Sequence, residues 1–355
     1  MNFYHSTLNK ILFIIILLST ASSQTYWVKY GWEVFKSAGD ARILSLGGSA
    51  VTDFGTSVSP LFNPASSNRV GLHNFNYTHQ NRLAGMINSD LIGFQINSYT
   101  RPINLILMHE GIDQIPDTRN ILLDFGFDGV PGTGDIGENN GLLDDGERLD
   151  ENKIKYFSQR QIGFHLSTAW EKKELTYGLA LKGLNHTLGE YSAFGVGLDF
   201  GILARPWDNG QIGITIQDIS TSWLVWDNGT VERFKPTIIS GISHTYAFKN
   251  LPLAINAMGN FIWELSGKNF DDDLKFENHG VKLLLGLNII YNQMVAVRIG
   301  RNKTGTNTAG IGLSWENISL DYAFLNEPVN SGLGATHLIS LSANSEWIFS
   351  YLKNI

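Results

Sequence analysis

The stretch AFGVGLDFGILA, from Ala193 to Ala204, alternates between two kinds of side chain along its whole length. The apolar side chains belong to Phe194, Val196, Leu198, Phe200 and Ile202. The small or acidic residues between them are Gly195, Gly197, Asp199 and Gly201. Successive side chains of a strand point to opposite faces, so this stretch predicts a strand with one apolar face and one small or polar face.

The same alternation recurs from Leu72 to the end of the chain, for example in RQIGFHLSTAW (160–170), TAGIGLSWE (308–316) and ISLDYAFL (318–325). Roughly fourteen such runs start near residues 72, 90, 103, 160, 175, 194, 210, 237, 252, 281, 294, 308, 318 and 336. Many are about ten residues long, which is the length that a tilted strand needs to cross a bilayer.

Two all-β architectures fit this pattern: a soluble sandwich or propeller, and a transmembrane antiparallel β-barrel. The barrel is favoured because the faces opposite the apolar residues are rich in Gly, Ser, Thr and Ala, with few of the Lys and Glu residues of a wet surface. No repeat of fixed period supports a propeller. Aromatic residues near strand ends are typical of a membrane-interface girdle, although core aromatics are an alternative. These residues are Trp170, Trp207, Trp223, Trp226, Trp315 and Trp347.

The amino-acid composition excludes several classes of function. Charged residues make up 17% of the 355, below the quarter that is usual in soluble domains. The chain has no cysteine, which excludes disulfides, thiolate metal sites and cysteine nucleophiles. The negative net charge of −7 comes from one part of the chain. Residues 113–151 contain eight Asp and three Glu but only two Arg. No basic cluster with interleaved aromatics supports nucleic-acid binding.

The N-terminus has the pattern of a secretory signal peptide. Lys10 precedes an apolar run from Ile11 to Leu18, and Ala21 and Ser23 fit the cleavage site before Gln24. The run is too short to span a bilayer, and a buried helix is the less favoured alternative. We therefore expect residues 1–23 to be a signal peptide and the mature chain to be exported.

Residues 24–70 show little alternation and are expected to form a separate N-terminal segment of turns and short helices. The segment contains Gly47-Gly48 and Asn63-Pro64-Ala65. The Asn63 side chain can accept from free N–H groups in a first helical turn, and Pro64 suits the first helical position.

The stretch SAGDARILSLGGSAVTDFGTSVSPLFNPASSN (37–68) resembles the N-terminal signature of the PorV/PorQ group of outer-membrane proteins, which are similar to FadL-type channels. The resemblance rests on Gly39, Ala41-Arg42, Leu46-Gly47-Gly48 and Asn63-Pro64-Ala65, with Asp53 as the remnant of an acidic element. It implies a fourteen-stranded barrel with the N-terminal segment as a plug in the lumen. It also implies transport of hydrophobic or unknown solutes, or escort of cargo in type IX secretion.

The chain departs from outer-membrane strands that end in an aromatic residue at the last position, because it ends WIFSYLKNI. Trp347, Phe349 and Tyr351 still alternate, so the sequence predicts a last strand that runs to Tyr351.

The acidic stretch DFGFDGVPGTGDIGENNGLLDDGE (124–147) lies inside an expected loop insert, residues 111–157, of the barrel part 71–355. Asp124, Asp128, Gly129 and Asp135 match positions 1, 5, 6 and 12 of an EF-hand loop, although Gly126 stands at position 3. Glu138, Asn140, Asp144 and Glu147 could complete a second, less regular calcium site. The alternative is a solvated surface loop. Long loops of such barrels are extracellular, so we expect the insert outside the cell.

Catalytic signatures do not appear in the sequence. There is no GxSxG, no P-loop, no HExxH and no GxGxxG between a strand and a helix. Asp199, Asp321, Lys182 and Arg298 fall on the expected lumen face, where ion pairs would line the wall.

The sequence thus predicts a non-enzymatic barrel in a bacterial outer membrane, in contact with outer-membrane lipid and without a certain cofactor beyond candidate Ca²⁺. Its expected partners are secretion components and cargo proteins, or small hydrophobic solutes. The alternatives are a secreted, soluble, calcium-binding β-protein with an adhesion role, and a barrel enzyme, for which no Ser/His or carboxylate pair stands out.

Overall fold

The computed structural model describes residues 25–28, 31–69, 71, 73–96, 101–219, 221–264, 272–276, 280–327 and 334–353. The predicted signal peptide, residues 1–23, lies outside these residues.

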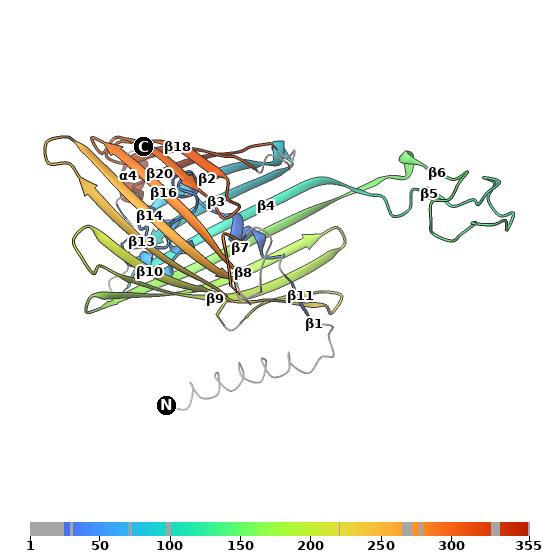
Figure 1. The fold of residues 1–355 in the computed structure, drawn as a ribbon, viewed down its shortest axis with the longest axis horizontal. Helices are drawn as coiled ribbons and strands as arrows, with labels where there is room; N and C mark the ends of the chain where they lie inside the picture. The colour runs from blue at the N-terminus through green and yellow to red at the C-terminus, as the bar shows by residue number, and fades with distance from the viewer. Residues whose placement is uncertain are drawn as a thin grey trace, which may run out of the picture.

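Fourteen of the described strands form a closed antiparallel barrel (Figure 1). Each strand pairs with the next along the chain, and the last pairs with the first, so that Phe75 lies opposite Ala343. All fourteen predicted strands are present, each beginning within five residues of the predicted start. The barrel strands are β2 (Phe75–Arg82), β3 (Ile87–Ile96), β4 (Ile103–Asp117), β7 (Lys155–Lys172), β8 (Leu175–Leu188), β9 (Tyr191–Ala204), β10 (Gly210–Gln217), β13 (Thr237–Ala247), β14 (Leu253–Glu264), β16 (Gly280–Tyr291), β17 (Val295–Arg301), β18 (Asn307–Ser314), β19 (Ile318–Leu325) and β20 (Thr336–Ala343).

Shorter elements complete the described structure. Short strands are β1 (Thr25–Trp27), β5 (Leu122–Leu123), β6 (Arg148–Leu149), β11 (Ser222–Trp226), β12 (Val231–Phe234) and β15 (Leu274–Lys275). Helices are α2 (Glu33–Ser37), α3 (Ala41–Ser45) and α4 (Ser345–Leu352), and 3-10 helices are η1 (Ser59–Leu61), η2 (Pro64–Arg69), η3 (Leu83–Gly85) and η4 (Glu151–Lys153). The β11–β12 hairpin extends the wall beyond β10 and β13, and β1 pairs in parallel with β12.

The apolar face of the wall points outward, as the alternation predicts. On β9, Phe194 and Val196 are 55% and 44% exposed, whereas Asp199 is 1% exposed and faces the lumen. An outer wall of this kind is stable against lipid and would be unfavourable against water. The chain is therefore an outer-membrane barrel, and the alternative of a secreted, soluble β-protein does not fit this surface.

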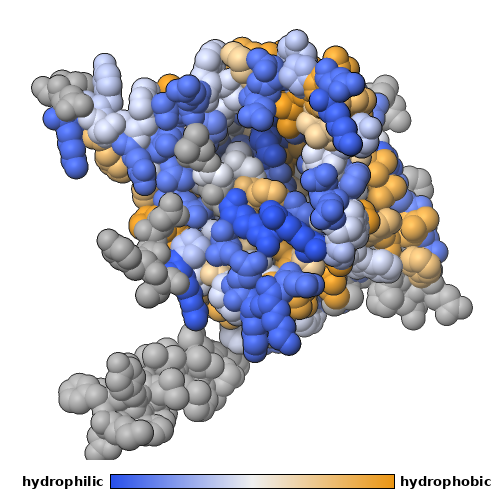
Figure 2. Space-filling view, turned by 90° about the vertical axis from the view of Figure 1, so that its left-hand side faces the viewer, coloured by the Kyte–Doolittle hydropathy of each residue, from blue (hydrophilic) through white to orange (hydrophobic). Residues whose placement is uncertain are grey.

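The two ends of the barrel differ in the lengths of their connections. At one end, residues 173–174 and 292–294 are tight turns. At the other end, residues 118–154 form an insert that projects away from the barrel on the paired ends of β4 and β7 (Figure 1). Short turns are periplasmic and long loops extracellular in such barrels. We therefore call the end with the insert the extracellular end and the opposite end the periplasmic end. Figure 2 shows the periplasmic end, where hydrophilic side chains predominate and hydrophobic ones lie along the flank.

The predicted strand through Tyr351 is wrong, because residues 345–352 form helix α4. Strand β20 ends at Ala343, opposite the first residues of its two partner strands, Phe75 of β2 and Ile318 of β19. Asn344 then begins the helix, and its side chain accepts from the N–H groups of Glu346 and Trp347. A helix satisfies its own backbone groups where no neighbouring strand remains to do so.

Among the described residues, no helix is long and apolar enough to cross a membrane.

Candidate functional site

The described residues of the N-terminal segment, which we call the plug, lie inside the barrel and pack against its wall. Trp32, Ile43, Val58 and Ala65 have no exposed surface, and the 3-10 helix η2 packs against β7, β8 and β9. The chain of this segment enters at β1, which pairs with β12 near the extracellular end. It leaves at the start of β2, at the periplasmic end. The plug therefore runs through the lumen from the level of β12 to the start of β2.

Gly47 lets the plug backbone approach the wall, whereas the neighbouring Gly48 has ordinary space around it. Both have positive φ angles, of 70° and 75°, which side chains with a Cβ rarely adopt. A Cβ on Gly47 would lie 2.3 Å from the carbonyl oxygen of Arg301, and one on Gly300 would lie 2.3 Å from the Gly47 nitrogen. Backbone contacts backbone at Gly47 and Gly300, so neither of these two glycines tolerates a side chain.

The Asn63-Pro64-Ala65 motif makes a second close contact with the wall. The Asn63 side chain accepts from Ala65 N–H at 3.1 Å, so it caps η2 as predicted, and it donates to the Val51 carbonyl at 2.8 Å. Gly178 on β8 and Gly201 on β9 face the motif, and a Cβ on Gly178 would lie 2.1 Å from the Ala65 nitrogen. The motif thus serves both helix capping and docking.

A buried charge cluster holds the centre of the plug together. Arg42 donates two hydrogen bonds to Asp53, at 2.6 and 2.7 Å. Asp40 caps α3 by accepting from Ile43 N–H at 2.7 Å, and it accepts from the Thr56 hydroxyl at 2.5 Å. The family resemblance included Arg42 and Asp53 as separate positions, and the structure shows that their side chains form an ion pair.

The two carboxylates of this cluster differ in their protonation. Burial raises the pKa of Asp40 to about 6, because the charge of Arg42 and the bond from Thr56 only partly offset desolvation. Burial also opposes ionisation of Asp53, but the charge and hydrogen bonds of Arg42 outweigh it and lower the pKa. Asp53 is therefore the permanent anion, and Asp40 titrates near neutral pH.

A second buried cluster ties the start of the plug to the wall. Lys182 of β8 lies 2.8 Å from Asp199 of β9 and 2.5 Å from Asp218. The indole N–H of Trp32 donates to the same Asp218 carboxylate at 3.1 Å. Residues 31–37, which we call the arm, thus share an anchor, Asp218, with the barrel strands.

The arm cluster depends on a break in the wall that the sequence pattern did not reveal. Residues 218–221 separate β10 from β11, and Asp218 has a left-handed φ of 58°. This conformation turns Asp218 inward, and its N–H donates to Asp199 at 2.8 Å. Sequence reasoning placed Lys182 and Asp199 on the lumen face but missed Asp218 and Trp32. The signal available was the interrupted alternation after Gln217.

The predicted lumen ion pairs are present. Arg298 of β17 donates to Asp321 of β19 at 2.6 Å, across the intervening strand β18, where both charges are buried. Gly312 of β18 leaves space for this pair, since a Cβ there would lie 2.3 Å from Asp321.

The extracellular half of the lumen contains an apolar core. Trp32 stacks on Phe234 with ring centres 5.4 Å apart and tilts against Phe35 at 5.0 Å. Inward side chains of five strands and further plug residues complete this core. They are Val34, Val58, Leu61, Leu91, Ile106, Met108, Leu184, Ala193 and Leu224. Part of the wall behind the plug is therefore apolar, unlike the polar lining of a water-filled pore.

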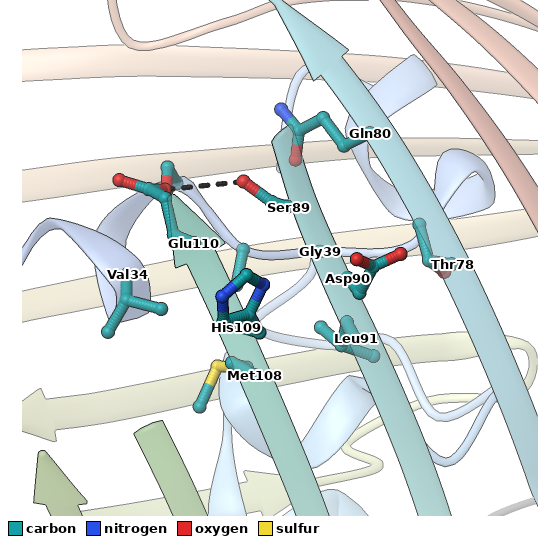
Figure 3. Close-up of a pocket in the computed structure, with 12 residues that line it drawn as sticks. Val34, Gly39, Thr78, Gln80, Ser89, Asp90, Leu91, Met108, His109 and Glu110 are labelled. Atoms are coloured by element: carbon teal, nitrogen blue, oxygen red, sulfur yellow. Dashed lines mark hydrogen bonds between the residues drawn. The ribbon is translucent and has the colours of Figure 1, made fainter. Parts of the chain in front are cut away.

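Beside this core, the plug meets β2, β3 and β4 without space for a solute. The cavity between them has a volume of about 10 Å³, enough for about one water molecule. Glu110 closes it by accepting from Ser37 of the plug at 3.1 Å and from Ser89 of β3 at 3.4 Å, the contact drawn in Figure 3. Arg82 also bonds to Glu110. A solute can pass here only if the plug moves.

The candidate calcium ligands lie in the insert, where their oxygens accept backbone N–H groups of the same loop. Asp124 accepts from Gly141, Asp135 from Asp128, Glu138 from Gly132 and Gly134, and Glu147 from Gly126 and Asp144. The Asp128 carboxylate accepts from Val130 N–H, and Asp144 accepts from the Asn140 amide. Within the described part of the chain, no three His, Asp or Glu side chains gather as a metal site would require. Calcium binding stays a prediction.

Comparison with known proteins places the fold. No family model and no curated protein matches this chain. The Pseudomonas putida toluene transporter TodX matches with a TM-score of 0.51 and 10% identity, over 91% of this chain and 100% of that one. The Ralstonia pickettii toluene transporter TbuX matches with a TM-score of 0.48 and 13% identity, over 86% and 98%. A Pseudomonas aeruginosa FadL homologue matches with a TM-score of 0.39 and 13% identity, over 84% and 95%. The likeness to TodX shows that this chain shares the barrel fold of that protein.

Proposed function

We propose that this barrel conducts small hydrophobic solutes across the outer membrane, with the plug as the closed gate. The apolar core in the lumen supports this proposal most strongly. Leu91, Ile106 and Leu184 face inward and are at most 4% exposed, and they belong to the same buried apolar cluster as Trp32 and Phe35 of the arm. An apolar solute that displaced the arm would meet an apolar wall, where its desolvation is favourable.

The likeness in fold to transporters that carry toluene, by the names of those proteins, suggests toluene as the first probe. Uptake of radiolabelled toluene would be measured in cells without hydrocarbon channels of their own, with and without this protein. We expect a several-fold faster initial rate with the protein. A polar sugar of similar mass should show no comparable increase.

The control for uptake is the folded state of the barrel. Unheated protein from the outer membrane should migrate faster on a gel than heated protein, as closed barrels do. Uptake equal to that of the cells without the protein, at a full level of folded barrel, would reject the proposal.

Cargo escort in type IX secretion, as in PorV-like proteins, is the second candidate. Its support is the extracellular insert, where Phe127 is 76% and Ile136 is 90% exposed. Large apolar side chains so far from lipid are typical of a protein-binding surface. Affinity isolation from membranes of the native host should then recover secretion components or cargo, and less of them after removal of residues 118–154. Unchanged recovery without the insert would leave this candidate without its support.

A further inference from the structure

Helix α4, at the C-terminal end, exposes most of its apolar side chains. Trp347 is 37% exposed, Phe349 55% and Tyr351 61%, while Ser345 is buried at the first turn. The rings of Trp347 and Tyr351 stack with centres 6.1 Å apart, one helical turn from each other. The exposed Trp347 and Tyr351 rings would be unfavourable in water, so this side of the helix needs an apolar surface to cover it.

The helix begins at the periplasmic edge of the barrel wall (Figure 1). The backbone N–H of Asn344 donates to the Asn317 carbonyl, in the turn between β18 and β19, at 2.9 Å. The N–H of Ser345 donates to the Asn74 side chain, just before β2, at 2.8 Å. Two hydrogen bonds thus fix the start of α4 at the seam where β20 pairs with β2 and closes the barrel.

The side chains of α4 divide into two faces. At about 100° per residue, Trp347, Ile348 and Tyr351 fall on one side of the helix, and Glu346 and Ser350 on the other. Phe349 points away from the first group. Trp and Tyr are the side chains that prefer the interface between lipid and water. A short helix with this division lies flat in such an interface.

We propose that α4 lies in the inner-leaflet interface of the outer membrane, with Trp347, Ile348 and Tyr351 in contact with lipid. Continuity with the lipid-facing wall selects lipid over a protein partner. The outward residues Ile339 and Leu341 of β20, directly before the helix, are 56% and 43% exposed toward lipid. Trp315, in the turn that holds Asn344 through Asn317, is also exposed at this end.

The Trp347 and Tyr351 side chains reach the interface from a helix that is bonded to the turns beside β2 and β19. The anchor therefore acts on the closing seam of the barrel.

Single cysteines test the proposal, since the chain contains none of its own. A fluorescent NBD label would be attached to Trp347→Cys, Tyr351→Cys, Glu346→Cys or Ser350→Cys, with each barrel in phosphatidylcholine vesicles. Nitroxide-labelled lipid should quench positions 347 and 351 strongly and positions 346 and 350 at most half as much. Ile339→Cys, on the lipid-facing wall, is the positive control, and Gly132→Cys, in the insert, is the negative one.

Two results would overturn the proposal. Equal quenching at all four positions would mean that the helix has no lipid-facing side. Absence of lipid quenching at positions 347 and 351 would mean that the helix lies in water, or, if aqueous iodide also fails to quench there, against protein. Ile348→Cys replaces either aromatic variant that does not show the gel shift of a folded barrel.

Discussion

At the residue scale, glycines decide how closely plug and wall approach. Gly178→Ala would place a methyl group 2.1 Å from the Ala65 nitrogen and so force η2 away from β8. Overpacking of this kind costs about 1–3 kcal/mol. We expect a fall of several degrees in the temperature at which the folded gel form disappears.

Gly259→Ala is the matched control for that substitution. Gly259 also lies within a barrel strand, but an added Cβ would meet its nearest neighbour, Leu285, at an ordinary 3.5 Å. The control should melt within about one degree of the wild type. Equal melting temperatures of the two variants would mean that the Gly178 contact is not tight.

Asp40 gives the plug a pH dependence. Its pKa is raised from 3.8 to about 6 in the folded chain, so the folded state binds the proton more tightly than the unfolded state. Its contribution to stability is complete below pH 4 and is lost as the pH rises through 6. By pH 7 the loss is roughly 2–3 kcal/mol.

Asp40→Asn tests this contribution, because an amide oxygen can still cap α3 without titrating. We expect the variant to be more stable than the wild type at pH 7 and to show a smaller gain between pH 7 and pH 5. Thermal melting at both pH values measures the difference. A wild type that gains no more than the variant on acidification would contradict the assignment.

At the element scale, the arm and the rest of the plug are held by different clusters. Lys182 anchors the arm through Asp218 and Trp32, whereas Arg42 and Asp53 hold the centre. Lys182→Met would leave two buried carboxylates without a cation, which costs several kcal/mol. We expect this substitution to release the arm and leave the centre docked.

Cysteine labelling measures that release. In the Lys182→Met background, an impermeant maleimide should react with Ser37→Cys about tenfold faster, and with the buried Ser66→Cys at an unchanged rate. Lys282→Met, at another buried lysine of the barrel wall, is the control background. Faster labelling at both cysteines would indicate general opening rather than an arm that moves alone.

At the scale of the whole molecule, the insert stands apart from the barrel. β4 and β7 pair up to Asp117 and Lys155, beyond the ends of the neighbouring strands, so a short turn can replace residues 118–154. We expect the shortened barrel to melt within a few degrees of the full chain. A barrel that no longer folds would show that the insert takes part in assembly.

Calcium should act on the insert and not on the barrel. Its carboxylates repel one another unless a cation compensates their charge. We expect millimolar calcium to slow tryptic cleavage at Arg148 relative to chelator, while the melting temperature of the shortened barrel stays constant. Equal cleavage rates in calcium and chelator would reject the calcium site.

The sequence by itself determined the barrel. Whether a residue faces lipid or lumen depends on its parity along one strand, so the alternation in residues 193–204 predicts both faces without knowledge of any partner. The same parity placed Lys182, Asp199, Arg298 and Asp321 in the lumen. Local capping chemistry likewise predicted the role of Asn63.

Only the tertiary structure decided which of these groups meet and where the pattern stops. Asp218 joins Lys182 because a left-handed residue interrupts the wall, and Trp32 reaches both from more than 140 residues away in sequence. Tyr351 belongs to a helix because no neighbouring strand extends past Ala343, although aromatic residues still recur at alternate positions up to Tyr351. Pairing and termination depend on contacts between distant segments, and local periodicity contains no information about them.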